Sequence, residues 1–442
     1  MFRQHEFIEE SRKQWSSESA FVASMAAAAV GLGNLWRFPY IMGQNGGGAF
    51  VVAYLLALVV VVLPIMILEV AAGRLSEGST VSTYRQVGRL GAVYGWFVVL
   101  VTVAITSYYL VITGWTLGYA VDAVRGEVRV FEEFTRGYNS LWFFFGVIVL
   151  AGLVLIRGVA AIEKLSKILM PALLAIVLFL VYQASQTSGW GEAQDFFFKV
   201  DWSHLSSGQL WAVAFGQAFY TLAIGQGYLV TYGSFIPRKT HLPRACLTVA
   251  GVETSIALLA GWMIFPFVFS FGMDSGQGSA LAFETLPLVF DKIPGGDWLA
   301  ALFFTLFFVA AFTSSLAGLK VVVAAVTEEF RLSNVSALMI VTGIMLVLGT
   351  ISALSFTPLE WKIAGKPVLD VVDQVAGGNV IIFSGMIGAA LLCWFIPPDC
   401  IRSVLGTDNR WWEWRIYIVG RFLPLLVLLW LAVSLLRNKF YI

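Results

Sequence analysis

The feature that most constrains the fold is a succession of apolar stretches about 20 residues long, the length that an α-helix needs to cross the hydrocarbon core of a bilayer. These stretches lie at 19–42, 48–72, 92–123, 140–156, 162–184, 209–236, 243–271, 297–327, 334–352, 375–397 and 413–436. Only 12% of the residues are charged, roughly half the fraction found in soluble domains. The sequence therefore predicts an all-α, polytopic membrane protein with eleven transmembrane helices in a lipid bilayer.

Charge and cysteine usage argue against several classes of function. A net charge of +1 gives no basis for binding nucleic acid. The cysteines and histidines are too scattered to suggest a disulfide framework or a metal cluster. They are Cys246, Cys393, Cys400, His5, His204 and His241. Because the sequence also offers no nucleophile–base pair, we expect neither an enzyme nor an organic cofactor.

Positively charged residues predict the orientation in the membrane. If the N-terminus is cytoplasmic, the inner segments contain more lysine and arginine than the outer segments, as the positive-inside rule requires. An odd number of spans then places the C-terminus on the extracytoplasmic side. The N-terminal residues mix acidic and basic side chains, unlike the short basic start of a cleaved signal peptide. We expect a multi-pass protein of the cell membrane, and the sequence makes no prediction of its oligomeric state.

The first apolar stretch is interrupted halfway by polar and small residues. Gly31, Gly33 and Asn34 break the apolar run, and Arg37 follows. Irregular backbone at membrane depth is tolerated where protein or a water-filled cavity surrounds it, and transporters build ion and substrate sites from such broken helices. Glycines also allow two membrane helices to pack closely, which is the simpler explanation. Arg37 favours a functional break, because a charged residue inside an apolar segment is costly and usually functional.

The sixth stretch repeats this anomaly. Gly225 and Gly227 flank Gln226 inside another apolar run. Interrupted helices at matching positions of two halves indicate an inverted repeat with a binding site between them. The sequence thus predicts a 5+5 repeat with broken helices 1 and 6. We expect four regions: 1–18 as a cytoplasmic N-terminal segment, 19–184 and 209–397 as the two repeats, and 398–442 as the eleventh helix with the C-terminus.

Other polar residues lie within the seventh and eighth stretches. Glu253 is a carboxylate in an apolar segment, where it needs a cation or hydrogen-bond donors. Thr313, Ser314 and Ser315 form a run of hydroxyls. Hydroxyls in membrane helices usually bond to their own helical turn, so this run alone is a weak functional signal.

Several motifs in this order resemble those of the neurotransmitter:sodium symporters, a family that includes bacterial and archaeal amino-acid transporters of the leucine-transporter fold. The motifs are Val30-Gly31-Leu32-Gly33-Asn34-Leu35-Trp36-Arg37-Phe38-Pro39, Asn45-Gly46-Gly47-Gly48-Ala49-Phe50, Glu69-Val70-Ala71-Ala72-Gly73-Arg74, Tyr108-Tyr109, Ile162-Glu163-Lys164, Met170-Pro171, Gly216-Gln217-Ala218-Phe219-Tyr220-Thr221-Leu222 and Thr313-Ser314-Ser315. The resemblance covers nearly the whole chain. It implies the leucine-transporter-like fold and sodium-coupled transport by alternating access.

The resemblance implies sites for two sodium ions. The first site would use Ala29, Asn34, Thr221 and Glu253, where the family often has asparagine in place of Glu253. The second site would use the backbone carbonyls of Ala27, Val30 and Ala310 and the hydroxyls of Thr313 and Ser314. Carbonyl, amide and hydroxyl oxygens suit a hard cation.

The same resemblance implies an amino-acid site between the broken helices. Its residues would be Ala29, Leu32, Gly33, Ile105, Tyr109, Tyr220, Thr221, Ala223, Gln226, Ser314 and Gly318. Amides after the helix break and the Tyr109 hydroxyl would bind the substrate carboxylate. Ala223 and Gly318 are small and Gln226 is polar, which predicts an enlarged pocket for a hydrophobic, aromatic or polar-tipped amino acid.

Two charged pairs would act as gates by the same resemblance. Arg37 would pair with Asp373 on the outer side, directly or through water, with Asp370 as the next candidate. Arg12 would pair with Glu328 on the inner side, where the family usually has aspartate in place of Glu328. A solvated surface pair is the simpler explanation for Arg12 and Glu328, and such pairs contribute only about 0–1 kcal/mol.

Chloride-dependent relatives have a serine where this chain has Ala257, and Glu253 supplies a negative charge nearby. We therefore expect transport that does not require chloride. Lys320 within the eighth stretch would extend to the cytoplasmic surface or neutralise Glu328. The overall expectation is a sodium–amino-acid symporter. The alternative is a membrane amino-acid sensor that retains the transporter fold.

Overall fold

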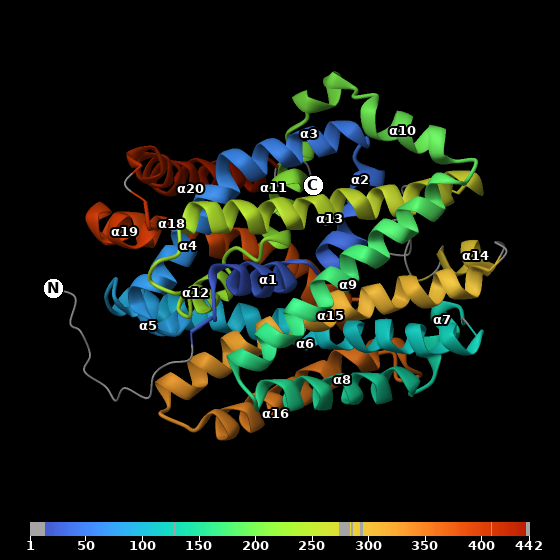
Figure 1. Cartoon of the computed structure of the whole chain (residues 1–442), viewed down its shortest axis with the longest axis horizontal. Coiled ribbons are helices and arrows are strands. Elements are labelled where there is room, and N and C mark those ends of the chain that lie inside the picture. Colours follow the sequence, from blue (N-terminus) through green and yellow to red (C-terminus); the bar gives the residue numbers. More distant parts are fainter. Residues whose placement is uncertain are drawn as a thin grey trace.

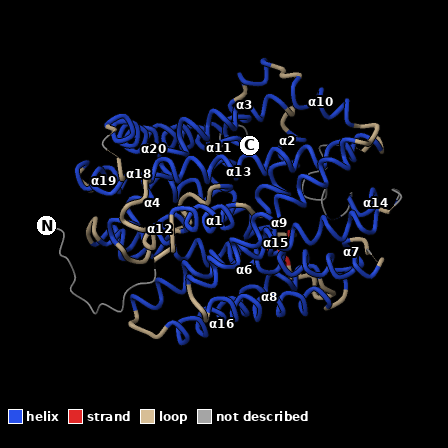
Figure 2. Tube along the Cα trace, viewed as in Figure 1, coloured by secondary structure: helices blue, strands red, loops and turns tan. Residues whose placement is uncertain are grey.

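The computed structural model describes residues 14–127, 129–273, 283, 286–291, 295–407 and 409–438. This part of the chain is almost wholly helical, and its strands form one two-stranded hairpin, β1 (Lys362–Ile363) with β2 (Lys366–Pro367) (Figure 2). The long helices run roughly along one common direction (Figure 1). This arrangement is the one expected of a bundle of membrane spans.

Long helices occupy most of the predicted spans. They are α6 (Arg89–Arg125), α9 (Val159–Ser185), α13 (Leu242–Ser270), α15 (Gly296–Glu329), α16 (Asn334–Ala353) and α20 (Arg410–Asn438). The second span consists of α3 (Gly48–Ala57), η2 (Leu58–Val62) and α4 (Leu63–Ser76). The tenth consists of α17 (Val368–Val372), η6 (Asp373–Val380) and α18 (Ile381–Phe395), and the fourth is the shorter helix α8 (Asn139–Leu155). Within the described residues, seven helices are long and apolar enough to cross a membrane, or eight if the bent first pair is one span.

The first span is broken where the sequence predicts it. Helix α1 (Glu18–Ala29) ends at Val30, whose backbone is extended, and η1 (Gly33–Arg37) leads into α2 (Phe38–Gln44). The two halves are bent by 54°. Amide and carbonyl groups near the break are therefore free of the regular helical pattern, which is what a binding site at mid-membrane requires.

The sixth span is broken in the same way. Helix α11 (Gly208–Thr221) and helix α12 (Tyr228–Gly233) are separated by a series of turns. Ala223, Gly225 and Gly227 have φ angles of 53°, 73° and 73° in this segment. Left-handed backbone suits glycine because other residues are strained there by their Cβ atoms. The two glycines that mark the anomaly in the sequence thus make the turn possible.

Close packing fixes α4 against α12, next to the second break. A Cβ atom on Gly73 would lie 2.0 Å from the Val230 carbonyl oxygen, and one on Gly233 would lie 2.5 Å from the Val70 oxygen. Small residues let membrane helices approach backbone to backbone. Helices α6 and α15 pack along one another on another side of the breaks. The breaks therefore lie inside the helical bundle.

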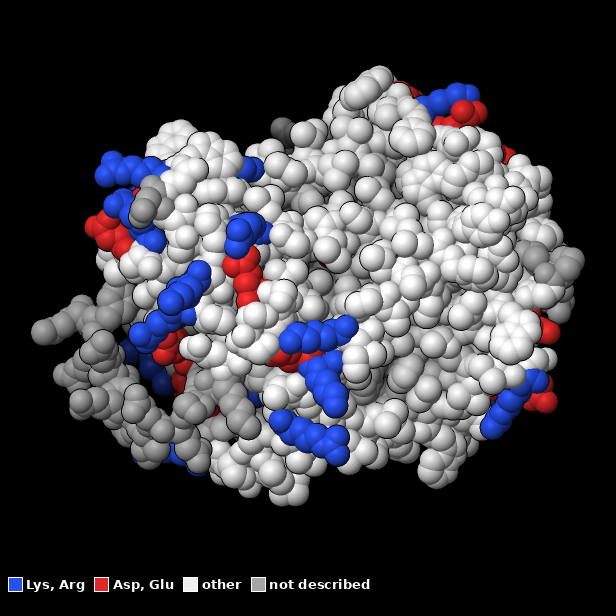
Figure 3. All heavy atoms as spheres, in the orientation of Figure 1, with Lys and Arg blue, Asp and Glu red and all other residues white. Residues whose placement is uncertain are grey.

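Shorter elements lie between the long helices. They are α5 (Thr80–Arg85), α7 (Phe131–Arg136), α10 (Trp190–Phe198), η3 (Trp202–Ser206), α14 (Leu286–Asp291), η5 (Leu354–Phe356) and α19 (Pro398–Leu405). Helices α5 and α19 lie at one end of the bundle, and α7, α10 and α14 lie at the other (Figure 1). On the face shown in Figure 3, most charged side chains lie over the half with α5 and α19, some lie at the opposite end, and a broad area between them has none. An uncharged belt between charged ends fits a protein that spans a bilayer.

Candidate functional site

Asn34 and Glu253 form the centre of a buried polar cluster. The Asn34 side-chain amide donates to the Glu253 carboxylate and, at 3.2 Å, to the Glu253 backbone carbonyl. The Gly31 amide donates to the Asn34 side-chain oxygen at 3.1 Å. Hydroxyls of Tyr54 and Thr254 donate to the other carboxylate oxygen at 3.3 and 3.2 Å. The break in the first span is thereby fastened to α13, and a carboxylate is placed beside it.

Thr221 adds a hydroxyl to this cluster from the second broken helix. It ends α11, is buried, and lies beside Glu253 and Tyr54. Its hydroxyl interacts with both of these side chains. An oxygen of this kind, next to a carboxylate and an amide, is chemically suited to a hard cation. Ala29, the remaining expected ligand, is buried at the end of α1.

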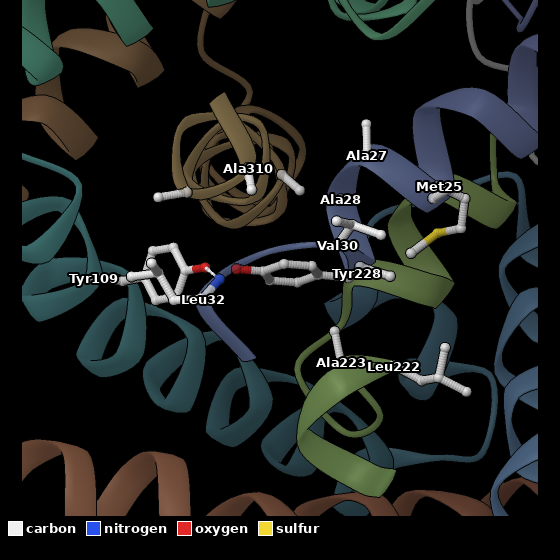
Figure 4. Close-up of a cluster of buried hydrophobic side chains, with 14 of the residues drawn as sticks. Met25, Ala27, Ala28, Val30, Leu32, Tyr109, Leu222, Ala223, Tyr228 and Ala310 are labelled. Carbon is white, nitrogen blue, oxygen red and sulfur yellow. Dashed lines mark hydrogen bonds between the residues drawn. The ribbon is translucent and has the colours of Figure 1, made fainter. Parts of the chain in front are cut away.

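The second expected sodium site lies where α15 meets the end of α1. The Ser314 hydroxyl donates to the carbonyls of Ala28 and Val30 at 2.8 and 3.2 Å. The Thr313 hydroxyl donates to Val309 and Ala310, both at 3.1 Å. Ser314 thus bonds across to the end of α1, whereas the Thr313 hydroxyl bonds within α15. Ala27 is also buried, and Figure 4 shows the helix that carries it beside the helix that carries Ala310.

Tyr109 and Leu32 define the expected carboxylate position. The Leu32 amide donates to the Tyr109 hydroxyl at 2.8 Å, which joins α6 to the break (Figure 4). A Cβ atom on Gly31 would lie 2.4 Å from the Tyr109 hydroxyl and 2.6 Å from Ser314 Oγ. The glycine thus gives both hydroxyls access to the backbone. An amide and a phenol hydroxyl are donors suited to a carboxylate.

The other expected pocket residues surround this point, with one difference from the prediction. Ile105, Ala223 and Gln226 are buried, and the Tyr220 ring would lie 3.0 Å from a Cβ atom on Gly33. The predicted enlargement at Gly318 is wrong, because the side chains of Thr106 and Tyr228 fill the space that a larger residue would occupy.

Sequence reasoning did not assign roles to Thr106, Tyr228 and Gln217. Gln217 lies one helical turn before Thr221, so its position in an apolar helix was a usable signal. Its side-chain nitrogen donates to the Gly33 carbonyl at 2.8 Å. Tyr228 directly follows the glycines of the second break, and this position was also a usable signal of a site residue. Thr106 gave no signal beyond its position next to Ile105.

Arg37 lies beside the pocket, and its contacts differ from the direct pairing with Asp373 that the gate prediction names first. Its guanidinium donates to Gln217 Oε1 at 2.6 Å and lies 4.7 Å from the centre of the Tyr220 ring. Asp373 instead accepts a hydrogen bond from the Tyr108 hydroxyl at 2.6 Å. The carboxylate still acts electrostatically on Arg37. The structure therefore places the four side chains in one group without a direct Arg37–Asp373 ion pair.

On the inner side, part of the predicted gate can be located. Arg12 lies outside the described residues. Glu328 is near the end of α15, and its carboxylate accepts from the Ser79 amide at 2.7 Å. Trp15 docks nearby, with its indole N–H donating to the Tyr232 carbonyl at 3.0 Å. The Lys320 ammonium lies 5.4 Å from the Phe235 ring centre, so it has an aromatic neighbour that the sequence did not predict.

Comparisons with known proteins agree with this architecture. The chain matches the model of the sodium:neurotransmitter symporter family over residues 12–140 and 137–440. It is 31% identical to the uncharacterized sodium-dependent transporter YhdH of Bacillus subtilis, over 90% of each chain. It is 28% identical to an uncharacterized sodium-dependent transporter of Haemophilus influenzae, over 94% of this chain and 97% of the relative.

A solved structure gives the same result for the fold. The crystal structure of MhsT in complex with L-phenylalanine superposes with a TM-score of 0.86 and 32% sequence identity, over 95% of this chain and 99% of MhsT. The prediction of an all-α transporter fold is confirmed by this match. The chain therefore belongs to the sodium:neurotransmitter symporter family, whose members are membrane-embedded, sodium-coupled transporters and not enzymes.

Proposed function

We propose that this protein is a symporter that couples the uptake of an amino acid to two sodium ions, by alternating access and without a requirement for chloride. The observation that carries the proposal is the buried cluster of Asn34, Thr221 and Glu253, in which the two broken helices meet α13. A carboxylate, an amide and a hydroxyl converge there, and together they offer a cation oxygen ligands and one negative charge.

The first sodium ion binds at this cluster, with the Ala29 carbonyl as a further ligand. The ion binds between these oxygens and separates Asn34 from Glu253. The second ion binds between α1 and α15, at the carbonyls of Ala27, Val30 and Ala310 and the hydroxyls of Thr313 and Ser314. Ser314 donates to the Val30 carbonyl at 3.2 Å, so a sodium ion bound at these two oxygens takes the place of a hydrogen bond between the two helices. Each ion therefore stabilises the ordered form of the breaks.

The amino acid binds next to both ions. Its carboxylate accepts hydrogen bonds from the Leu32 amide and the Tyr109 hydroxyl, which now bond to each other. The substrate thus replaces a contact inside the protein and joins α6 to the first broken helix. The phenylalanine bound to MhsT supports an amino acid as the class of substrate. Binding of the substrate therefore competes with this internal hydrogen bond.

Transport follows from alternate opening of the two sides of the site. Arg37 and Asp373, joined through Gln217, Tyr220 and Tyr108, close the outer side above the bound amino acid. On the inner side, Glu328 with Arg12 and the docked Trp15 must separate for release. The sodium gradient drives the cycle, together with about 2.3 kcal/mol for each elementary charge moved across 100 mV. We place the N-terminus in the cytoplasm and the C-terminus outside.

Chloride independence rests on Glu253. Its carboxylate is fully buried and is held by Asn34, Tyr54 and Thr254. When it is ionised beside a bound sodium ion, this carboxylate provides the compensation that a bound anion would otherwise supply. Ala257, one turn further along α13, is buried and has no group that could bind an anion.

Uptake of labelled amino acids by proteoliposomes tests the proposal. With sodium outside and a membrane potential negative inside, we expect accumulation against the concentration gradient, and we expect none when choline replaces sodium. Equal uptake in choline would contradict sodium coupling. A membrane sensor is the second candidate, and counterflow separates the two, because a sensor binds the amino acid but does not exchange labelled for unlabelled substrate.

A further inference from the structure

The residues directly before α1 are held against the end of α12. The Trp15 backbone amide donates to the Phe235 carbonyl at 2.9 Å, and its indole N–H donates to the Tyr232 carbonyl at 3.0 Å. The Trp15 and Tyr232 rings also lie 5.3 Å apart, centre to centre. Ser17 then begins α1, and its hydroxyl accepts from the Ala20 amide at 3.1 Å. The residue between Trp15 and Ser17 is therefore oriented by bonds on both sides.

That residue, Ser16, is bonded to α9. Its backbone amide donates to Glu163 Oε2 at 2.9 Å, and its hydroxyl donates to Glu163 Oε1. Helix α9 packs beside α1 (Figure 1). Hydrogen bonds to an ionised carboxylate are roughly twice as strong as those between neutral groups. Glu163 thus joins the chain before α1 to a helix far away in the sequence, by two bonds to one residue.

Lys167 completes this contact from the next turn of α9. Its ammonium lies 2.6 Å from Glu163 Oε1 and donates to the Ser16 hydroxyl at 3.1 Å. A solvated pair of this spacing contributes little by itself. Here, however, the Glu163 side chain is only 12% exposed, and both charged groups also bond to Ser16. We call Ser16, Glu163 and Lys167 the inner clasp.

The inner clasp acts on the segment that has to move in the proposed cycle. Trp15 must leave its place on the inner side before the amino acid and the ions are released. Ser16 is its neighbour in the chain, and consecutive Cα atoms are fixed about 3.8 Å apart. Trp15 therefore cannot move away while Ser16 remains bonded to α9. The bonds of the inner clasp exist in the closed form and are lost in the open form, and such a difference is what shifts an equilibrium between two forms.

We propose that the inner clasp holds the inner side of the transporter closed, and that Ser16, Glu163 and Lys167 are positioning residues that set how often this side opens. The inference rests on the proposed function. It adds to the expected pairing of Arg12 with Glu328 a second restraint, which fastens the same segment to α9. Loss of the inner clasp favours the form that is open to the cytoplasm.

The reactivity of a cysteine near Trp15 measures this opening. Ser234→Cys places a thiol next to Phe235, at a position that is 5% exposed here and whose hydroxyl bonds to its own helical turn. The rate of its reaction with a maleimide is measured on the purified full chain, against the parent protein without the added cysteine. We expect the reaction to be about tenfold faster with Glu163→Ala and severalfold faster with Ser16→Ala. Ser16→Thr retains the hydroxyl and should react like the protein with Ser16.

A charge exchange separates the inner clasp from simple stabilisation of α9. Glu163→Lys combined with Lys167→Glu keeps two opposite charges one turn apart, but it turns an ammonium towards the Ser16 amide, which cannot donate to it. If the pair only stabilises α9, the exchanged protein should react like the parent. We expect it to react as fast as Glu163→Ala.

The matched control is the corresponding pair on α10. Lys199 and Asp195 lie 2.6 Å apart at the same spacing along the helix, with side chains 75% and 58% exposed. Lys199→Met should leave the reaction rate of the Ser234→Cys thiol unchanged. Thermal unfolding in detergent verifies that each variant is folded, and Ser16→Ala, which alters one exposed side chain, provides the test if Glu163→Ala is not.

The outcomes distinguish this inference from the function on which it depends. Unchanged reactivity with Ser16→Ala and Glu163→Ala would overturn the inner clasp and leave the symporter proposal intact. Parental reactivity of the charge-exchanged protein would also overturn it. If the wild-type protein takes up no amino acid in a sodium-dependent way, the proposed function fails, whereas the cysteine reactivity still decides whether these residues hold the inner side closed.

Discussion

The guanidinium of Arg37 donates to the side-chain oxygen of Gln217 at 2.6 Å, and this contact joins the two broken helices of the protein. The nitrogen of the same Gln217 side chain donates to the Gly33 carbonyl at 2.8 Å. One buried amide therefore satisfies both a charged group and a carbonyl freed by the first break. Gln217 in this way couples the position of Arg37, the proposed outer gate, to the backbone that would bind the substrate.

Replacement of Gln217 should impair the outer gate more than ion binding. Gln217→Leu keeps similar volume but leaves the Arg37 guanidinium and the Gly33 carbonyl without this partner. Since losing a partner of a buried charged group costs about 1.5–3 kcal/mol, we expect at least about a tenfold loss in transport rate. Initial rates of uptake, measured together with sodium-dependent substrate binding, check this. Gln217→Glu, which retains an acceptor for Arg37, is the comparison variant. Unchanged uptake by Gln217→Leu would contradict the coupling.

The two proposed sodium sites predict different losses from two alanine variants. Asn34→Ala removes the amide that bonds to Glu253, and Thr313→Ala removes a hydroxyl proposed to bind the second ion, which bonds to Ala310 of its own helix. Each should abolish sodium-dependent amino-acid binding, because either ion orders one of the breaks. Binding of labelled substrate over a range of sodium concentrations tests both. Ser255→Ala is the control, since this exposed hydroxyl on α13 bonds only to its own helix, at Gly251. Normal sodium dependence in both site variants would refute the assignment.

The breaks could be predicted from the sequence because they depend on local chemistry. Gly225 and Gly227 interrupt an apolar run, and both adopt left-handed backbone in the structure. The joining of Asn34 to Glu253 could not be derived in this way. It depends on the packing of η1 against α13, and only the resemblance to a family placed these residues together.

The pocket could not be predicted from residue sizes alone. From the sequence, the small size of Gly318 predicts a larger pocket. In the structure, Thr106 and Tyr228 fill that volume from two other helices. Whether a small residue enlarges a pocket depends on its neighbours in space, and a single sequence does not identify those neighbours. The pairing of Arg37 with Gln217 was missed for a similar reason. The opposite charge of Asp373 suggested a simpler partner, but Asp373 bonds to Tyr108.

Anion replacement tests the role assigned to Glu253. Because the carboxylate supplies the negative charge beside the first sodium site, uptake by the wild-type protein should be the same in chloride and in gluconate. Glu253→Gln keeps the shape but removes the charge, so we expect the sodium concentration for half-maximal uptake to rise about tenfold or more. Sodium titrations of uptake in both anions measure these effects. Loss of wild-type uptake in gluconate would disprove chloride independence.

Gly225 should be among the least replaceable residues of the second break. Its φ angle of 73° is strained for other residues, and an added Cβ atom would lie 2.3 Å from the Gly385 backbone nitrogen. Its own amide donates to Glu69 at 3.0 Å, and its carbonyl accepts from Ser384 at 2.6 Å, so the segment cannot shift without losing these bonds. We expect Gly225→Ala to destabilise the protein by about 2 kcal/mol or more. Gly216→Ala is the matched control, because its Cβ atom would meet only the Ile382 side chain, at 3.5 Å, and alanine favours the helix. Thermal unfolding in detergent should show a clear loss for Gly225→Ala and none for Gly216→Ala, and equal stability of the two variants would contradict the assigned backbone constraint.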